Sequence, residues 1–271
     1  MIYDLQKASM LKRISAGILD FILTLIVATG ALFLLSSIFN YDGLSAEYDE
    51  RYGVLVEEVK LEYNIDFDAI SKMTTEEYSE YTARLKEEGR LEDLEKAEKY
   101  MVEDEQLNTC FQKIFTFTLL IVTFAILIAY MLVEFVIPLF LKNGQTVGKK
   151  VFGICLMMDN GVRIKPLALI IRTLLGKYTI ETMIIVYCAI MLFLFRFVNG
   201  ITVFMFAASA IIILAQLILI IVSKKNLLIH DVMSYTVVVD KESQMIFNSE
   251  EELIKYKQDL ADKNAKSKRT F

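Results

Sequence analysis

Four long apolar runs constrain what this chain can fold into more than any other feature of its sequence. Each run has at least 21 residues, and a helix needs roughly 20 residues to cross about 30 Å of hydrocarbon. The runs are too long and too uniformly apolar for amphipathic helices of a soluble domain. The sequence therefore predicts an all-α integral membrane protein with four transmembrane helices, at Ile14–Phe39, Ile114–Leu141, Tyr178–Val198 and Ile201–Val222, the last two joined by a tight turn at Asn199–Gly200.

Charged residues are divided unequally between the segments that join these runs. Residues 40–111 carry 21 Asp and Glu against 8 Lys and Arg, a net charge of −13, so the rest of the chain carries +8 and the whole chain −5. The short segments on the other side of the membrane are basic, and Lys and Arg beside a span stay on the cytoplasmic side. We therefore expect both termini to be cytoplasmic and the acidic segment to be extracytoplasmic.

This topology divides the chain into six parts. Residues 1–39 give a cytoplasmic segment and the first span, 40–111 an acidic helical extracytoplasmic insertion, and 112–141 the second span. Residues 142–177 form a basic cytoplasmic loop, 178–222 the hairpin of the third and fourth spans, and 223–271 a cytoplasmic strand and charged tail.

The insertion has the composition of a helical hairpin. Windows 44–63 and 75–110 are rich in Glu, Lys, Leu and Ala, with a break at 64–68. Thr74 and Glu77 have the spacing of a capping box that begins the second helix. The second window contains no proline, so it can run unbroken into the second span. Its acidic surface either solvates the hairpin or concentrates cations.

The inner loop predicts a small β element. Val151–Met158 alternates imperfectly between apolar and polar residues, and Asp-Asn-Gly at 159–161 is a turn signal. Val162–Ile164 would form the second strand of a short hairpin. The β-branched run Tyr235–Asp240 would add a third strand. Lys165 and the following proline open an apolar segment to residue 177 that we expect to be an interfacial helix along the inner leaflet.

Two carboxylates lie inside the apolar runs, where an unpaired charge is costly. Asp20 follows Arg13 by seven residues, which places both on one helix face with their Cα atoms about 10 Å apart. Glu134 precedes Lys142 by eight residues, so it is about 12 Å from the inner end of its span, at a depth similar to that of Asp20. Facing each other, the carboxylates would share a proton; alternatively each meets a cation or water separately. Asp20 and Glu134 are our candidate ion- or proton-binding residues.

Polar residues also gather at the inner ends of the spans: Arg172, Glu181, Gln216, His230 and Asp231. His230 is the only histidine, and histidine is the side chain whose ordinary pKa lies near neutrality. It is either part of a proton relay or a structural residue of a cytoplasmic loop. Asp231 has Arg13 and Arg172 as possible partners, which would hold this loop against the helices.

Motifs of enzymes and of cofactor sites are absent from the sequence. It contains no HExxH, GxSxG, Walker loop, CxxC or nucleotide fingerprint. The three cysteines fall at different depths and in different compartments, so we expect no disulfide and no cysteine-based metal site. We expect no enzyme, no catalytic residues, no cofactor, no metal and no nucleic-acid partner; the expected environment is the lipid bilayer.

Several of these stretches resemble the RDD family of bacterial membrane proteins, named for one arginine and two aspartates. The resemblance rests on Arg13 with Asp20, on GQTVGKKVFG at 144–153, on ICLMMDNGVRI at 154–164 and on HDVMSYTVVV at 230–239. It implies that Arg13, Asp20 and Asp231 are the three naming residues, that Lys149 and Arg172 are further family basic positions, and that the protein lies in a bacterial plasma membrane. Val147 stands where the family pattern leads us to expect proline, and the 72-residue insertion is longer than usual for the family.

Two functions fit these observations. The resemblance implies transport, with sodium/proton antiport suggested for some members. A small transporter or cation/proton antiporter would bind monovalent cations or protons at Asp20 and Glu134, while Arg13, Asp231 and His230 gate or relay from the inside. Four spans are few for a pathway, so this function implies a homodimer. The alternative is a non-transporting scaffold or accessory protein whose outer hairpin binds a partner; it would tolerate Asp20→Asn.

Overall fold

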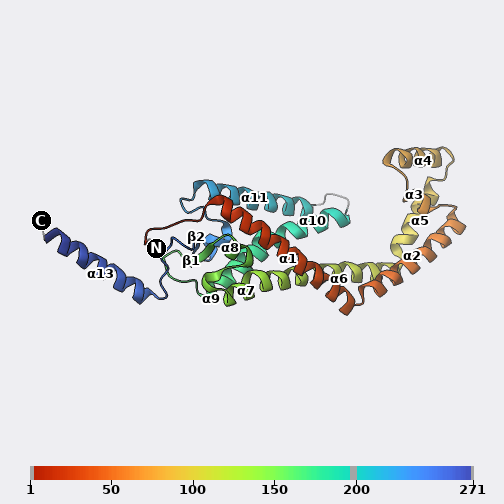
Figure 1. The fold of residues 1–271 in the computed structure, drawn as a ribbon. Coiled ribbons are helices and arrows are strands. Elements are labelled where there is room, and N and C mark those ends of the chain that lie inside the picture. Colours follow the sequence, from red (N-terminus) through yellow and green to blue (C-terminus); the bar gives the residue numbers. More distant parts are fainter. Residues whose placement is uncertain (1–2, 196–199, 270–271) are drawn as a thin grey trace. The chain divides into compact units, whose positions relative to one another are not determined.

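The fold comes from a computed structural model that describes residues 3–195 and 200–269. It is 76% helical and contains one two-stranded sheet within these residues. The chain divides into two compact units, one formed by residues 1–31 with 123–271 and the other by residues 32–122. Figure 1 follows the chain through its helices and strands.

Within the described residues, four helices are long and apolar enough to cross a membrane, which confirms the four predicted spans as helices. They cover Met10–Ile38, Glu105–Phe140, Pro166–Leu192 and Val203–Val222. The first is α1 (Met10–Ile38), and the last lies within α11 (Gly200–Val222). The second is built from α6 (Glu105–Tyr130), the π-helical η1 (Met131–Val136) and α7 (Ile137–Phe140). The predicted turn at Asn199–Gly200 includes Asn199, which lies outside the described residues.

The third span begins earlier than the sequence suggested. The helix starts with α9 (Pro166–Ile170), continues through the π-helical η3 (Ile171–Met183) and ends as α10 (Ile184–Phe195). The expected separate interfacial helix up to residue 177 is therefore wrong, because its residues are the first turns of the third span. Arg172, in this helix, is buried inside the protein.

The sheet differs from the predicted hairpin in its pairing. Strands β1 (Ile154–Met158) and β2 (Thr236–Asp240) are antiparallel, with Ile154 opposite Asp240 and Met158 opposite Thr236. The segment expected to return as the second strand contributes only isolated bridges, Arg163 to Met157 and Val162 to Phe247. Strand β2 pairs with β1 over five residues, and its first four residues, the β-branched run 236–239, are buried on both faces of the strand, which a three-residue return cannot achieve.

Residues before β1 are helical, not extended. The short helices η2 (Lys142–Gly144) and α8 (Val147–Val151) precede the strand, and α12 (Ile229–Met233) precedes β2. Thr146 begins α8 by accepting a hydrogen bond from the Lys149 amide at 3.2 Å. The final helix is α13 (Glu250–Arg269).

The insertion is a small helical unit with its own core. It contains α2 (Tyr41–Tyr63), α3 (Phe67–Ile70), α4 (Thr75–Glu87) and α5 (Leu91–Glu103). The predicted capping box is confirmed: the Glu77 amide donates to Thr74 Oγ1 at 3.3 Å, and the Thr74 amide donates to the Glu77 carboxylate at 2.7 Å. The buried side chains are Val59, Ile65, Leu85, Leu94 and Ala97.

The second window of the insertion does not run unbroken into the second span. Gly89, with φ +71°, follows the end of α4, and the Arg90 amide donates to the Leu85 carbonyl at 2.8 Å. Asp104 then separates α5 from α6, and its carboxylate accepts the Leu107 amide at 2.7 Å. A glycine and an aspartate therefore divide this window without any proline.

Candidate functional site

Asp20 binds the beginning of α8 from inside the first span. Its side chain is 3% exposed and lies on the line of α1 residues, four apart, that face the protein interior. One carboxylate oxygen accepts the Gly148 amide at 2.8 Å, and the other accepts the Thr146 hydroxyl. The carboxylate thus satisfies an amide that a helix N-terminus leaves without a backbone partner.

Gly148 allows this close approach between α8 and α1. A Cβ atom at this position would overlap the Ala16 carbonyl oxygen and lie 2.9 Å from the Asp20 carboxylate. Any side chain here must push the two helices apart. The glycine is therefore a requirement of the Asp20 contact.

Lys149 joins Asp20 to the second candidate carboxylate. Its Nζ lies 3.4 Å from Glu134 Oε2 and 4.0 Å from Asp20 Oδ2, and the lysine is buried. Lys177 forms a second ion pair with Glu134, and Thr173 donates to the Glu134 carbonyl at 3.0 Å. Among the described residues the two carboxylates do not hydrogen-bond to each other; a lysine stands between them.

Burial changes the titration of Lys149. Loss of solvent lowers the pKa of its ammonium to about 8, and the charges of Lys177 and Arg172 act in the same direction. The carboxylates of Glu134 and Asp20 oppose this shift. Lys149 thus loses its proton much nearer to neutral pH than an exposed lysine does.

Asp231 ties three segments together. Its carboxylate forms ion pairs with Arg13 of α1, at 3.0 Å, and with Arg172 of η3. It also accepts the Leu228 amide at 3.0 Å and is fully buried. Burial alone would raise the pKa of this carboxyl, but Arg172, His230 and Arg13 hold it well below its usual range. Removing one partner of such a buried pair costs about 3–5 kcal/mol.

One buried donor of the Arg172 guanidinium has no hydrogen-bond partner among the described residues. Its Nη1 donates to Asp231 and, at 2.8 Å, to the Thr236 hydroxyl, whereas Nε has no hydrogen-bond partner within the described chain. An unsatisfied buried donor costs about 1–3 kcal/mol. The arginine is only 2% exposed.

His230 docks α12 onto the third span. Its Nδ1 lies 2.8 Å from both Glu181 oxygens, and its amide donates to Oε1 of that residue at 3.0 Å. Gly176 makes room for it, because a Cβ there would lie 2.5 Å from the His230 Cβ. Burial and the charge of Arg172 lower the pKa of His230, so the imidazole is neutral near pH 7.

A cavity of about 250 Å³ adjoins this network. Four cationic side chains line it, together with Asp20 and His230; the four are Arg13, Lys149, Arg172 and Lys177. Apolar residues of α1 and α11 complete its wall. Five of the seven candidate residues of the sequence analysis therefore line one common cavity.

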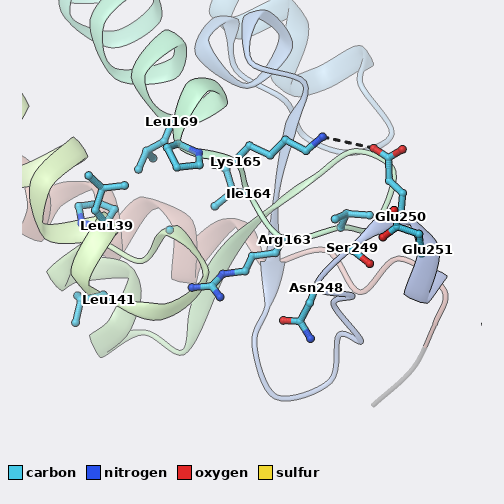
Figure 2. A pocket seen from close by; sticks show the side chains of 14 residues that line it. Leu139, Leu141, Arg163, Ile164, Lys165, Leu169, Asn248, Ser249, Glu250 and Glu251 are labelled. Carbon is cyan, nitrogen blue, oxygen red and sulfur yellow. Dashed lines mark ion pairs between the residues drawn. The ribbon is translucent and has the colours of Figure 1, made fainter.

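A larger cleft lies elsewhere in the same unit. Figure 2 shows its lining, from the end of α7 and the segment after β1 to the first turn of α13. Its ion pair, Lys165 with Glu250 at 3.6 Å, is exposed. The cleft contains none of the candidate residues of the sequence analysis.

All seven candidate residues belong to these paired groups; five of them line the cavity, and Glu134 and Asp231 do not. Sequence reasoning missed Lys177, Thr146, Gly148 and Gly176 as contributors. Lys177 was assigned to an interfacial helix; once the third span is begun at Pro166, its position falls inside that span. Across the described residues, no group of three or more His, Cys, Asp or Glu could hold a metal, and the three cysteines are free.

Comparison with protein families supports the resemblance. The model described as "RDD family" matches residues 7–235 of the chain, which confirms the resemblance seen in the sequence. Comparisons with curated proteins and with solved structures gave no match.

Gly148→Ala is expected to lower the stability of the folded protein by about 1–3 kcal/mol, because a methyl group must separate α8 from α1. The measurement is thermal unfolding of the full chain in detergent. Gly30→Ala is the matched control, since a Cβ at Gly30 meets no atom within 4 Å. Equal unfolding midpoints for the two variants would contradict the close approach.

Proposed function

This chain belongs to the RDD family of membrane proteins, and on that basis we propose that it is a small membrane transporter exchanging a monovalent cation for a proton at Asp20, Lys149 and Glu134. One observation carries the proposal: a buried ammonium lies between two buried carboxylates on two different spans. A charge in that position can be supplied by a protonated lysine or by a metal cation.

The exchange follows from charge balance. When Lys149 loses its proton, the N–H bond breaks, the electron pair stays on Nζ, and one positive charge leaves the site. Glu134 keeps Lys177, but Asp20 then has no cationic partner within 4 Å in the described part of the chain. Because an uncompensated buried charge is costly, a monovalent cation beside Asp20 and Glu134 restores the balance. One cation replaces one proton.

Exchange of a cation for the Lys149 proton should be fastest at mildly alkaline pH. The groups facing Lys149 are Asp20 of α1, Glu134 of η1, and Arg172 and Lys177 of η3. With a pKa of about 8, about a tenth of the Lys149 side chains are neutral at pH 7 and about nine tenths at pH 9. Exchange therefore rises about tenfold over this interval.

The remaining groups are positioning residues in this proposal. Arg13, Arg172 and Asp231 hold α12 and β2 against the spans, and His230 with Glu181 fixes the other side of α12. Only 6% of the Val203–Val222 span is buried. A second copy of the chain covering this span would complete a pathway, so we propose a homodimer.

We also propose that both termini and the inner loop are cytoplasmic in a bacterial plasma membrane, with residues 40–111 outside. The distribution of basic residues supports this orientation. Ser79→Cys and Lys257→Cys each add one exposed thiol, on α4 and on α13, to a protein whose three native cysteines are buried. In intact cells a membrane-impermeant maleimide is expected to label the first and to spare the second; the reverse pattern would contradict the orientation.

Proton flux in proteoliposomes tests the exchange. A pH-sensitive dye is trapped inside, and Na⁺, K⁺ and Li⁺ are added outside in turn. Wild-type protein is expected to give cation-dependent alkalinisation that grows between pH 7 and 9. Asp20→Asn and Lys149→Arg are expected to fall to the level of protein-free liposomes, since arginine does not release its proton.

Lys150→Arg is the matched control, because Lys150 is the exposed neighbour of Lys149. It is expected to keep wild-type flux. Flux that survives Lys149→Arg would contradict the exchange at this site.

A non-transporting scaffold is the alternative, and one observation favours it. Asp20, Glu134, Glu181 and Asp231 each already have a partner that would serve purely to lock the helices together. The insertion also has its own core and would present a stable surface to a partner. Well-folded wild-type protein without flux for any cation would favour this alternative.

A further inference from the structure

We propose that the 250 Å³ cavity beside the network binds the phosphate group of an anionic membrane lipid. The inference goes beyond cation exchange and does not depend on it, because it concerns a ligand bound at equilibrium without any gradient.

The polar lining of the cavity is mainly cationic. Arg13, Arg172, Lys149 and Lys177 reach its wall, against the single carboxylate of Asp20, whose two oxygens already accept from Thr146 and Gly148. The partners of the cations, Glu134 and Asp231, do not line the cavity. An entering ligand therefore meets N–H donors and positive charge, which suits an anion.

Arg172 supplies an independent sign of a ligand. It is 2% exposed, it lines the cavity, and its Nε–H has no partner within the described residues. Guanidinium groups bind phosphate oxygens through planar pairs of N–H donors. A phosphate oxygen would satisfy the donor that the protein leaves unpaired.

The rest of the wall is apolar and belongs to membrane spans. Ile14 of α1 and Ile220 of α11 line the cavity with Leu228, and Ile14 is half exposed on the face of its span. A free phosphate would leave this surface against water, whereas a lipid would cover it with its glycerol and first methylenes. The combination of a basic end and an apolar wall favours a lipid over an inorganic anion.

Phosphatidylglycerol is expected to bind more tightly than phosphatidylcholine. Both carry a phosphodiester, but the choline group of the second adds a positive charge that the cationic lining repels. Native mass spectrometry of the full chain in detergent, titrated with each lipid and separately with inorganic phosphate, measures the three affinities. We expect at least about a tenfold preference for phosphatidylglycerol over the other two.

Two variants locate the site. Arg172→Lys removes the Nε–H fork while keeping the charge, and Gly17→Leu fills the cavity, because a Cβ at Gly17 meets no atom within 4 Å. Each is expected to weaken phosphatidylglycerol binding about tenfold. The controls are Arg163→Lys at an exposed position and Gly30→Leu, which is on the same helix but away from the cavity. Size-exclusion profiles establish that each variant is folded.

The outcomes separate the possible ligands. Selective binding lost in both cavity variants and kept in both controls supports the lipid site. Inorganic phosphate bound as tightly as phosphatidylglycerol would overturn the lipid assignment in favour of a free anion. Lipid binding unchanged in Gly17→Leu and Arg172→Lys, or no lipid binding at all, would overturn the site itself.

Discussion

Asp231 has no contact with solvent, and its charge is balanced by two arginines from two different spans. A carboxylate in that position is stable only while both segments stay in place. The pairing therefore fixes α12 and β2 to α1 and η3, and β2 in turn holds β1. The positions of α12, β2 and β1 therefore depend on the Asp231 carboxylate. The ion pair of Lys149 with Glu134 and the hydrogen bond of His230 with Glu181 are further contacts near this group.

The proposed exchange and the proposed lipid site use neighbouring parts of one network. Four cationic side chains around the cavity oppose the approach of a metal cation to Asp20, whereas a phosphate in the cavity offsets their charge. An anionic lipid would thus favour cation entry next to a neutral Lys149. Gly148 and Gly176 have a common role here, because each lets a short inner helix lie against a span. Close packing, and not a flexible loop, places the titrating lysine between its carboxylates.

The sequence predicted the spans well because 20-residue apolar runs have few alternatives in a membrane protein. It also pointed to Asp20 and Glu134, since charges inside apolar runs require partners, and to Arg13 and Arg172 as possible partners of Asp231. The partners themselves were harder to find. The position of Lys177 is hard to predict because Pro166 is typical of a helix start and so suggests a separate interfacial helix, whereas the π-helical turns continue directly into the third span. The pairing of β1 with β2 joins residues that are 78 positions apart at Met158–Thr236 and 86 apart at Ile154–Asp240, which local turn signals at 159–161 could not reveal. In the insertion, Gly89 and Asp104 end helices through backbone geometry and capping, and a search for prolines overlooks both.

Isothermal titration calorimetry of Na⁺ binding to the detergent-solubilised protein tests whether a bound cation replaces the Lys149 proton. At pH 7 most Lys149 side chains carry their proton, so cation binding must displace it. In two buffers with different ionisation enthalpies, exchange of a cation for a proton predicts different binding heats. The difference should correspond to about one proton released per bound cation. Lys149→Arg should abolish both the binding and the difference. Na⁺ binding with the same heat in both buffers would contradict the exchange of a cation for the lysine proton.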